Sequence, residues 1–271
     1  MSNIKLPSGA KMSKKDKFLG SLTYVIPAVV IVGLIGLIAA FAVIPNLNKP
    51  STTDGTVQIE PKLVNEIGGY HLVNGKVDNT LSAQGTGVRV DMFFDPQCPG
   101  CGYVDRSIND RLQELSTNGN IDLYLYPVSF LNQASTDDYS ARAASAVITV
   151  AEGDGSKVLP FIKKIYENQP EEGARYKSVS NLDLRDWAIE VGVEKSVADN
   201  IVGVKYVDWV LKNTDVIDNE RSDFFPDGIG TPAVFVGTEF KDGKAINAQR
   251  LSFGADEEPV VVFNRAVESV K

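Results

Sequence analysis

Apolar and polar residues alternate along several short stretches of the sequence, and this pattern predicts β-strands. Through residues 88–94 every second side chain belongs to a β-branched, aromatic or long apolar residue, so we predict a buried strand there. The apolar stretch 121–131 predicts a second strong strand, and 233–237, which follows Pro232, predicts a third. Weaker strand patterns occupy 57–67, 70–73 and 245–251.

A second periodicity, in which apolar residues recur every three or four positions, predicts helices. Val104, Ile108, Leu112 and Leu115 share one face of a helix that follows the 88–94 strand. A longer helical block at 135–221 follows the second strand. Its predicted pieces are 137–152, 157–168, 182–191 and 195–219, and a last helix is predicted at 257–270. This order predicts an α/β sheet whose first two central strands are parallel, with the helical block inserted before the third.

The first residues of the chain follow a different pattern. No Asp, Glu, Lys or Arg occurs from residue 18 to residue 48, and 22–44 is long enough to cross a bilayer, which takes roughly 20 residues. We therefore predict one N-terminal transmembrane helix at 18–45. The lysines of 1–17 favour a cytoplasmic tail, and the Pro- and Thr-containing stretch 46–56 is typical of a linker. A cleaved signal peptide is the alternative, although its apolar core is usually about 7–15 residues long.

This topology places residues 57–271 outside the cytoplasm, at the cell membrane, where thiols meet an oxidising environment. The formal net charge of the whole chain is −8, and several of its basic residues lie in the predicted tail. An acidic outer part is unsuited to nucleic acid, whose binding needs basic stripes.

Both cysteines of the chain, Cys98 and Cys101, lie where the 88–94 strand is predicted to give way to a helix. The first turn of a helix presents unpaired N–H groups and the positive end of the helix dipole, which stabilise a thiolate. Pro99 suits the first helical turn because it has no N–H group to leave unpaired. Gly100 lets the backbone approach a partner closely. Cys101, one turn along, is near enough to form a disulfide with Cys98.

Three kinds of site can use such a pair. A structural zinc site needs about four ligands, whereas the chain offers two cysteines and His71, so we predict no metal. A purely structural disulfide would close a very short loop and therefore stabilise little. Thiol–disulfide exchange is the chemistry that the pattern favours.

The order of a strand, C-P-x-C, a helical insertion and G-T-P-A-x-F-V resembles the DsbA-like branch of the thioredoxin fold. The stretch FFDPQCPGC is similar to the aromatic-aromatic-x-x-Q-C-P-x-C pattern of membrane-anchored members, and YPVSFL at 126–131 resembles their second central strand. The resemblance covers about 85–271. It implies a thioredoxin-like domain at 57–271 with a helical domain inserted at about 135–221.

The same resemblance implies roles for four residues. Cys98 would be the nucleophile, Cys101 the resolving thiol, and Thr231 and Pro232 a cis-Pro loop that pairs with the substrate backbone. The implied activity is disulfide formation in reduced, unfolded exported proteins, with no cofactor besides the redox-active disulfide. A quinone-linked membrane partner would re-oxidise the pair.

Two positions depart from the family pattern. Gly100 stands where strong oxidants carry a histidine, and Met92 stands where a buried acid assists proton transfer. Asp91 is adjacent but is expected on the other face, as a strand-end or surface acid. Because Gly100 weakens the expected oxidising power, a disulfide reductase or isomerase remains an alternative. A non-catalytic thioredoxin-like binding module is another.

Overall fold

The computed structural model of the chain describes residues 59–78, 87–170, 179–220, 230–237, 239–241, 244–246 and 248–270. These residues belong to one compact unit, Val57–Lys271. The predicted tail, transmembrane helix and linker lie outside the described residues. Among the helices that are described, none is both long and apolar enough to cross a bilayer.

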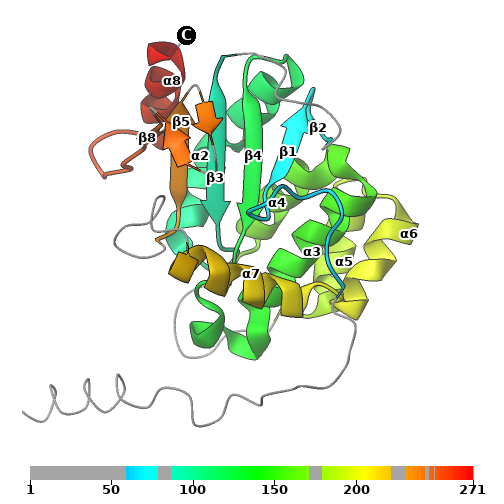
Figure 1. Cartoon of the computed structure of the whole chain (residues 1–271). Coiled ribbons are helices and arrows are strands. Elements are labelled where there is room, and N and C mark those ends of the chain that lie inside the picture. The colour runs from blue at the N-terminus through cyan, green and yellow to red at the C-terminus, as the bar shows by residue number, and fades with distance from the viewer. Residues whose placement is uncertain are drawn as a thin grey trace, which may run out of the picture. The chain divides into compact units, whose positions relative to one another are not determined.

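A mixed six-stranded sheet in the order β2-β1-β4-β3-β5-β8 forms the centre of the unit (Figure 1). β3 (Arg89–Phe94) and β4 (Asp122–Pro127) are parallel, with Met92 opposite Leu125, and α2 (Pro99–Thr117) connects them. The other strands of this sheet are β1 (Tyr70–Val73), β2 (Lys76–Val77), β5 (Ala233–Gly237) and β8 (Gln249–Arg250). A separate two-stranded sheet pairs β6 (Glu239–Lys241) with β7 (Lys244–Ile246).

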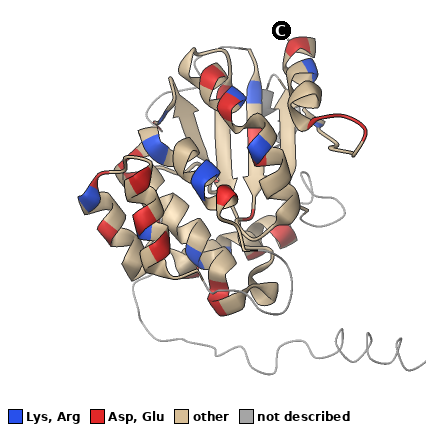
Figure 2. Cartoon of the chain, turned by 180° about the vertical axis from the view of Figure 1, so that it is seen from behind, with Lys and Arg blue, Asp and Glu red and all other residues tan. Residues whose placement is uncertain are grey.

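Between β4 and β5 the chain is mainly helical. The helices are α3 (Tyr139–Gly153), α4 (Val158–Glu167), α5 (Asn181–Glu190), α6 (Lys195–Ala198) and α7 (Val207–Glu220), and α8 (Pro259–Ser269) closes the fold. Figure 1 shows α3, α5 and α6 gathered beside the sheet and α7 running across the ends of its strands. In the opposite view, acidic and basic residues are mixed over the helices, with no separate basic stripe on the described part of that face (Figure 2).

The alternation along β3 divides the core between the two faces of the sheet. Val90, Met92 and Phe94 join the large apolar cluster that includes the buried sides of α2, α3, α4 and α8. Phe93 faces the other way and stacks on Tyr126, with ring centroids 4.1 Å apart. Burial on both faces explains why the stretch contains so many large apolar residues.

Three predicted elements differ from the structure. The strand predicted at 57–67 is wrong over its described residues, where only an isolated bridge joins Val64 to Tyr70. The Glu152 carboxylate accepts hydrogen bonds from the backbone N–H groups of Lys62 and Leu63 at 3.0 and 2.9 Å. These N–H groups are therefore paired with a side chain of α3 and not with the backbone of a neighbouring strand.

The helix predicted at 195–219 is interrupted. A 3₁₀ turn, Asp199–Gly203, follows α6, and Val204 has a φ of 42°, which no α-helix can accommodate. The strand predicted at 245–251 exists as two short ones, β7 and β8.

Candidate active site

The turn between β3 and α2 presents the cysteine pair. Cys98 is the N-cap of α2 and Pro99 is its first helical residue. Asp95 shapes the turn, because its carboxylate accepts the N–H of Gln97 at 2.7 Å and its carbonyl accepts the N–H of Cys98 at 3.0 Å. The backbone thus leaves the strand sharply and places the Cys98 thiol at the start of the helix.

A second segment closes over the pair. The peptide bond between Thr231 and Pro232 is cis, and the Cys98 thiol donates a hydrogen bond to the Thr231 carbonyl at 3.3 Å. A Cβ on Gly100 would lie 3.1 Å from Cδ of Pro232, which is tight, so glycine allows the two segments to approach. The structure therefore brings Cys98, Gly100 and Cys101 together with Thr231 and Pro232, although Cys98 and Thr231 lie 133 positions apart in the chain. No disulfide joins the two cysteines in this structure.

The two thiols differ strongly in acidity. The pKa of Cys98 is lowered to about 6, mainly by a hydrogen bond from the Cys101 thiol; burial opposes this shift, and a hydrogen bond from the Thr231 side chain adds to it. Burial and the neighbouring Cys98 raise the pKa of Cys101 well above its usual range. Cys98 is 7% exposed and Cys101 is fully buried. At pH 7 the pair therefore favours a thiolate at Cys98 and a protonated thiol at Cys101.

Asp95, which the sequence reasoning missed, connects the active-site turn to the helical block. Its carboxylate accepts the Leu131 N–H at 2.7 Å and the Ser140 hydroxyl at 2.8 Å. The Tyr166 hydroxyl donates to its carbonyl at 3.0 Å. An acid directly after a buried strand and before a proline is the signal that predicts such a turn.

Gln169, just beyond α4, fixes the same turn from the other side. Its amide nitrogen donates to the carbonyls of Pro96 and Cys98, each at 2.9 Å. A Cβ on Gly102 would lie only 2.4 Å from the Gln169 side-chain oxygen. The absence of a side chain at position 102 therefore makes room for this clamp.

The position of the family's strand acid is occupied by an apolar residue, as the sequence indicates. Met92 is buried in the large core cluster, to which both cysteines also belong. Asp91 faces the opposite side of the sheet, as expected, but the prediction that it is a strand-end or surface acid is wrong, because it is 1% exposed. Arg89 donates to both of its carboxylate oxygens at 2.7 and 2.8 Å, and the Tyr126 hydroxyl donates at 2.8 Å. These partners make burial of the charge possible.

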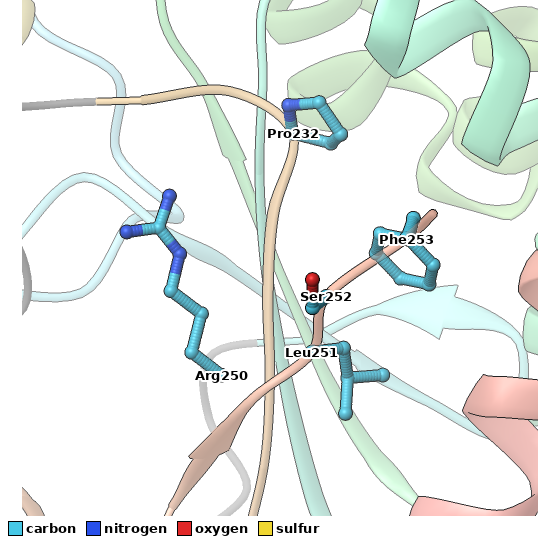
Figure 3. A pocket seen from close by; sticks show the side chains of 5 residues that line it. All are labelled: Pro232, Arg250, Leu251, Ser252 and Phe253. Atoms are coloured by element: carbon cyan, nitrogen blue, oxygen red, sulfur yellow. The ribbon is translucent and has the colours of Figure 1, made fainter. Parts of the chain in front are cut away.

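An open depression lies beside the cis-Pro loop. It has a volume of about 410 Å³ and is lined by Pro232, Arg250, Leu251, Ser252 and Phe253. Figure 3 shows Phe253 and Leu251 on one side of the Pro232 segment and Arg250 on the other. The Leu251 N–H donates to the Val234 carbonyl at 2.8 Å, which ties this wall to β5.

Within the described residues, no group of three or more His, Cys, Asp or Glu side chains is placed to hold a metal ion. The site chemistry that the structure presents is that of the two thiols.

No protein-family model matches the sequence, and no curated protein matches it either. Solved structures do resemble it. DsbA of Mycobacterium tuberculosis in its oxidised form is 23% identical with a TM-score of 0.54, over 74% of this chain and 92% of that one. MdbA, a thiol-disulfide oxidoreductase from Corynebacterium diphtheriae, is 18% identical with a TM-score of 0.52, over 77% and 96% of the two chains. BdbD from Bacillus subtilis is 20% identical with a TM-score of 0.51, over 73% and 97%.

At these identities the similarity establishes the fold. The chain has the thioredoxin-like sheet with inserted helices of the DsbA structures, which confirms the fold that the sequence motifs predict.

Proposed function

We propose that this chain is a thiol–disulfide oxidoreductase that forms disulfides in reduced, unfolded exported proteins. The observation that carries the proposal is the unequal pair: Cys98 at the start of α2, with a pKa of about 6, beside Cys101, whose pKa burial raises. A low-pKa thiol that leaves readily makes its disulfide reactive toward other thiols. The DsbA-type fold supports the same activity.

In this reaction the only redox group is the disulfide between Cys98 and Cys101. A client thiolate attacks the Cys98 sulfur, a mixed disulfide forms, and Cys101 leaves with the electron pair and takes up a proton. A second client thiolate then attacks the client sulfur of the mixed disulfide. The client gains a disulfide and Cys98 leaves as a thiolate, so two electrons pass to the protein. A membrane redox partner returns the pair to the disulfide.

The client lies against the cis-Pro loop in this proposal. The Thr231 backbone is beside Cys98, and the neighbouring depression offers the apolar side chains of Leu251 and Phe253. An unfolded segment presents both an unpaired backbone and apolar side chains, so it suits this surface.

The proposed location is the outer face of the cell membrane. The support is the sequence pattern of a transmembrane helix at 18–45, a lysine-containing tail at 1–17 and a linker at 46–56. Nucleic acid is not a proposed partner.

The test uses the full chain in detergent, in its oxidised form, mixed with a reduced and unfolded client protein. We expect client disulfides to form faster than in the absence of the protein. Cys98→Ala removes the nucleophile and abolishes the effect. In Cys101→Ala, the Cys98 thiolate should attack a client that carries a disulfide, release one client thiolate, and leave a mixed disulfide that can be isolated because no second thiol resolves it. A wild-type protein that leaves the rate of client oxidation unchanged would refute the proposal.

Two other functions predict different measurements. Gly100 in place of histidine favours a reductase or isomerase, for which the potential should approach that of thioredoxin, roughly −270 mV. A higher potential supports the oxidase. A non-catalytic binding module predicts an unreactive Cys98, which the lowered pKa argues against.

A further inference from the structure

Re-oxidation of the pair requires a proton to leave a buried atom. Cys101 is fully buried, and its pKa lies well above the usual range. Its thiol must lose a proton before its sulfur can attack the Cys98 mixed disulfide, because the thiolate is the nucleophile. Met92 occupies the position of the family's strand acid, so another group must accept this proton.

Two buried acids near the pair are poorly suited to accept it. Burial raises the pKa of Asp95, but its carboxylate already accepts hydrogen bonds from Gln97, Leu131 and Ser140, which occupy its oxygens and oppose that shift. Asp91 lies on the opposite face of the sheet, where Arg89 neutralises it.

Asp105 has the required properties. It lies one helical turn after Cys101 on the buried face of α2 and is 1% exposed. Helical side chains lean toward the N-terminus, so the carboxyl leans toward the turn that contains Cys101. One oxygen accepts the Asn109 amide at 2.8 Å. The other, Oδ2, is buried and has no hydrogen-bond partner within the described chain, so it has a free position for a proton.

Tyr166 of α4 lies near both groups. Burial raises the pKa of its phenol first, and the charges of Cys101, Asp105, Asp95 and Cys98 raise it further. Its hydroxyl donates to the Asp95 carbonyl at 3.0 Å, so α4 packs over the turn that carries the pair.

The remaining charged groups around Asp105 come from α2 and α4. Lys163 forms an ion pair with Asp110 at 2.7 Å, and Arg106 donates to the Tyr166 carbonyl at 3.1 Å. Both cations therefore have other partners. Burial, the largest influence, raises the pKa of Asp105 to about 7 in spite of them.

We infer that Asp105 accepts the proton of Cys101 when the disulfide re-forms and returns it when the disulfide is reduced. This inference rests on the proposed function. In the step, the Cys101 proton moves to the Asp105 carboxylate and the Cys101 sulfur attacks the Cys98 sulfur. A disulfide forms between them, the bond from Cys98 to the partner's sulfur breaks, and the partner leaves as a thiolate with the electron pair.

The experiment follows that step with glutathione as the probe. Reduced full-length protein in detergent is mixed with oxidised glutathione, and acid-quenched samples are analysed by mass spectrometry across the neutral pH range. The mixed disulfide at Cys98 forms first, and its decay measures the attack by Cys101. We expect the wild-type decay rate to rise with pH and level off above about 7. In Asp105→Asn it should be about 100-fold slower at pH 7 and continue to rise with pH.

The matched control is Glu114→Gln, which removes an exposed acid from the same helix and should decay as the wild type does. Formation of the mixed disulfide should be equally fast in all three proteins. Equal decay profiles in Asp105→Asn and wild type would overturn the role of Asp105 and leave the proposed function standing. If wild-type Cys98 forms no mixed disulfide, the proposed function itself fails.

A measurement on the wild type covers the case in which Asp105→Asn does not fold. The side-chain carboxyl carbon of Asp105 is followed by NMR in the reduced protein as the pH is changed. We expect a midpoint near pH 7. A carboxyl that stays ionised at pH 5 would contradict the inference.

Discussion

Replacing Thr231 by valine removes the hydroxyl group beside the cysteine pair and keeps the shape of the side chain. The Cys101 thiol does most to lower the pKa of Cys98, and the Thr231 side-chain hydrogen bond does so as well. A hydrogen bond to a charged group contributes about 1.5–3 kcal/mol, and one pKa unit corresponds to about 1.4 kcal/mol. The lower value applies, because the Thr231 hydrogen bond lowers the pKa of Cys98 less than the Cys101 hydrogen bond does. The pKa of Cys98 should rise by about one unit.

The expected change in redox potential follows from this shift in the pKa of Cys98. A higher pKa means a less stable thiolate and therefore a less stable reduced form. One pKa unit corresponds to about 30 mV for a two-electron couple, so Thr231→Val should be the weaker oxidant by about that amount. At pH 7 the thiolate fraction should fall from about nine-tenths to about one-half.

Two measurements check this prediction. The ultraviolet absorbance of the thiolate, followed against pH, gives the pKa of Cys98, and equilibrium with glutathione gives the potential. Thr231→Ser is the control, because it retains a hydroxyl and should behave nearly as the wild type. If Thr231→Val leaves the pKa at its wild-type value, or if the serine variant shifts it equally, the assigned hydrogen bond does not stabilise the thiolate.

Three further predictions follow from the site. With a pKa of about 6 for Cys98, the redox potential of the Cys98–Cys101 couple should fall by about 59 mV per pH unit below pH 6 and by about 30 mV per pH unit above it. A titration without this change of slope would contradict the difference in pKa between the two thiols. Gly102→Ala should displace Gln169 and lower the free energy of unfolding by about 1–3 kcal/mol in chemical denaturation, whereas Gly203→Ala, which meets no atom within 4 Å, should change little. Because the pKa of Asp105 is raised from 3.8 in the unfolded chain to about 7 in the folded one, the protein should lose stability as the pH rises through this range. Asp105→Asn should therefore have a higher free energy of unfolding than the wild type at pH 8, by at most about 4 kcal/mol, and the difference should disappear below pH 4. A variant that is less stable than the wild type at pH 8 would refute this.

The sequence predicts the central strands and most helices because each has a strong local period. β3 is buried on both faces, and α2 carries one clear apolar stripe, so their side chains alone indicate their structure. The break between α6 and α7 is different. Val204 adopts a positive φ that valine disfavours, so the tertiary contacts impose it against the local preference.

The candidate site shows the same division. The cysteine motif and the G-T-P segment can be found from the sequence, and the structure brings them together, while their catalytic roles remain proposals. The buried acids could not be predicted, because an aspartate in an amphipathic helix is normally exposed. Only the packing of α4 against α2 shows that Asp105 lies inside. Asp91 was predicted on the surface because its compensating partners, Arg89 and Tyr126, can be identified only once β3 and β4 are paired.

The hydrogen bonds that Ser140, Tyr166 and Gln169 make to the active-site turn have a consequence for how the unit opens. These donors belong to the inserted helical block, whereas their acceptors belong to the turn between β3 and α2. Local unfolding of α3 or α4 would release the carbonyls around Cys98 at the same moment, so the helices and the turn form one cooperative opening unit. Native-state hydrogen exchange should then report one shared free energy of opening for the amides of α4 and for those of the first turn of α2. The inserted helices therefore help to hold the turn that carries Cys98, and variants that loosen α3 or α4 should also change the reactivity of Cys98.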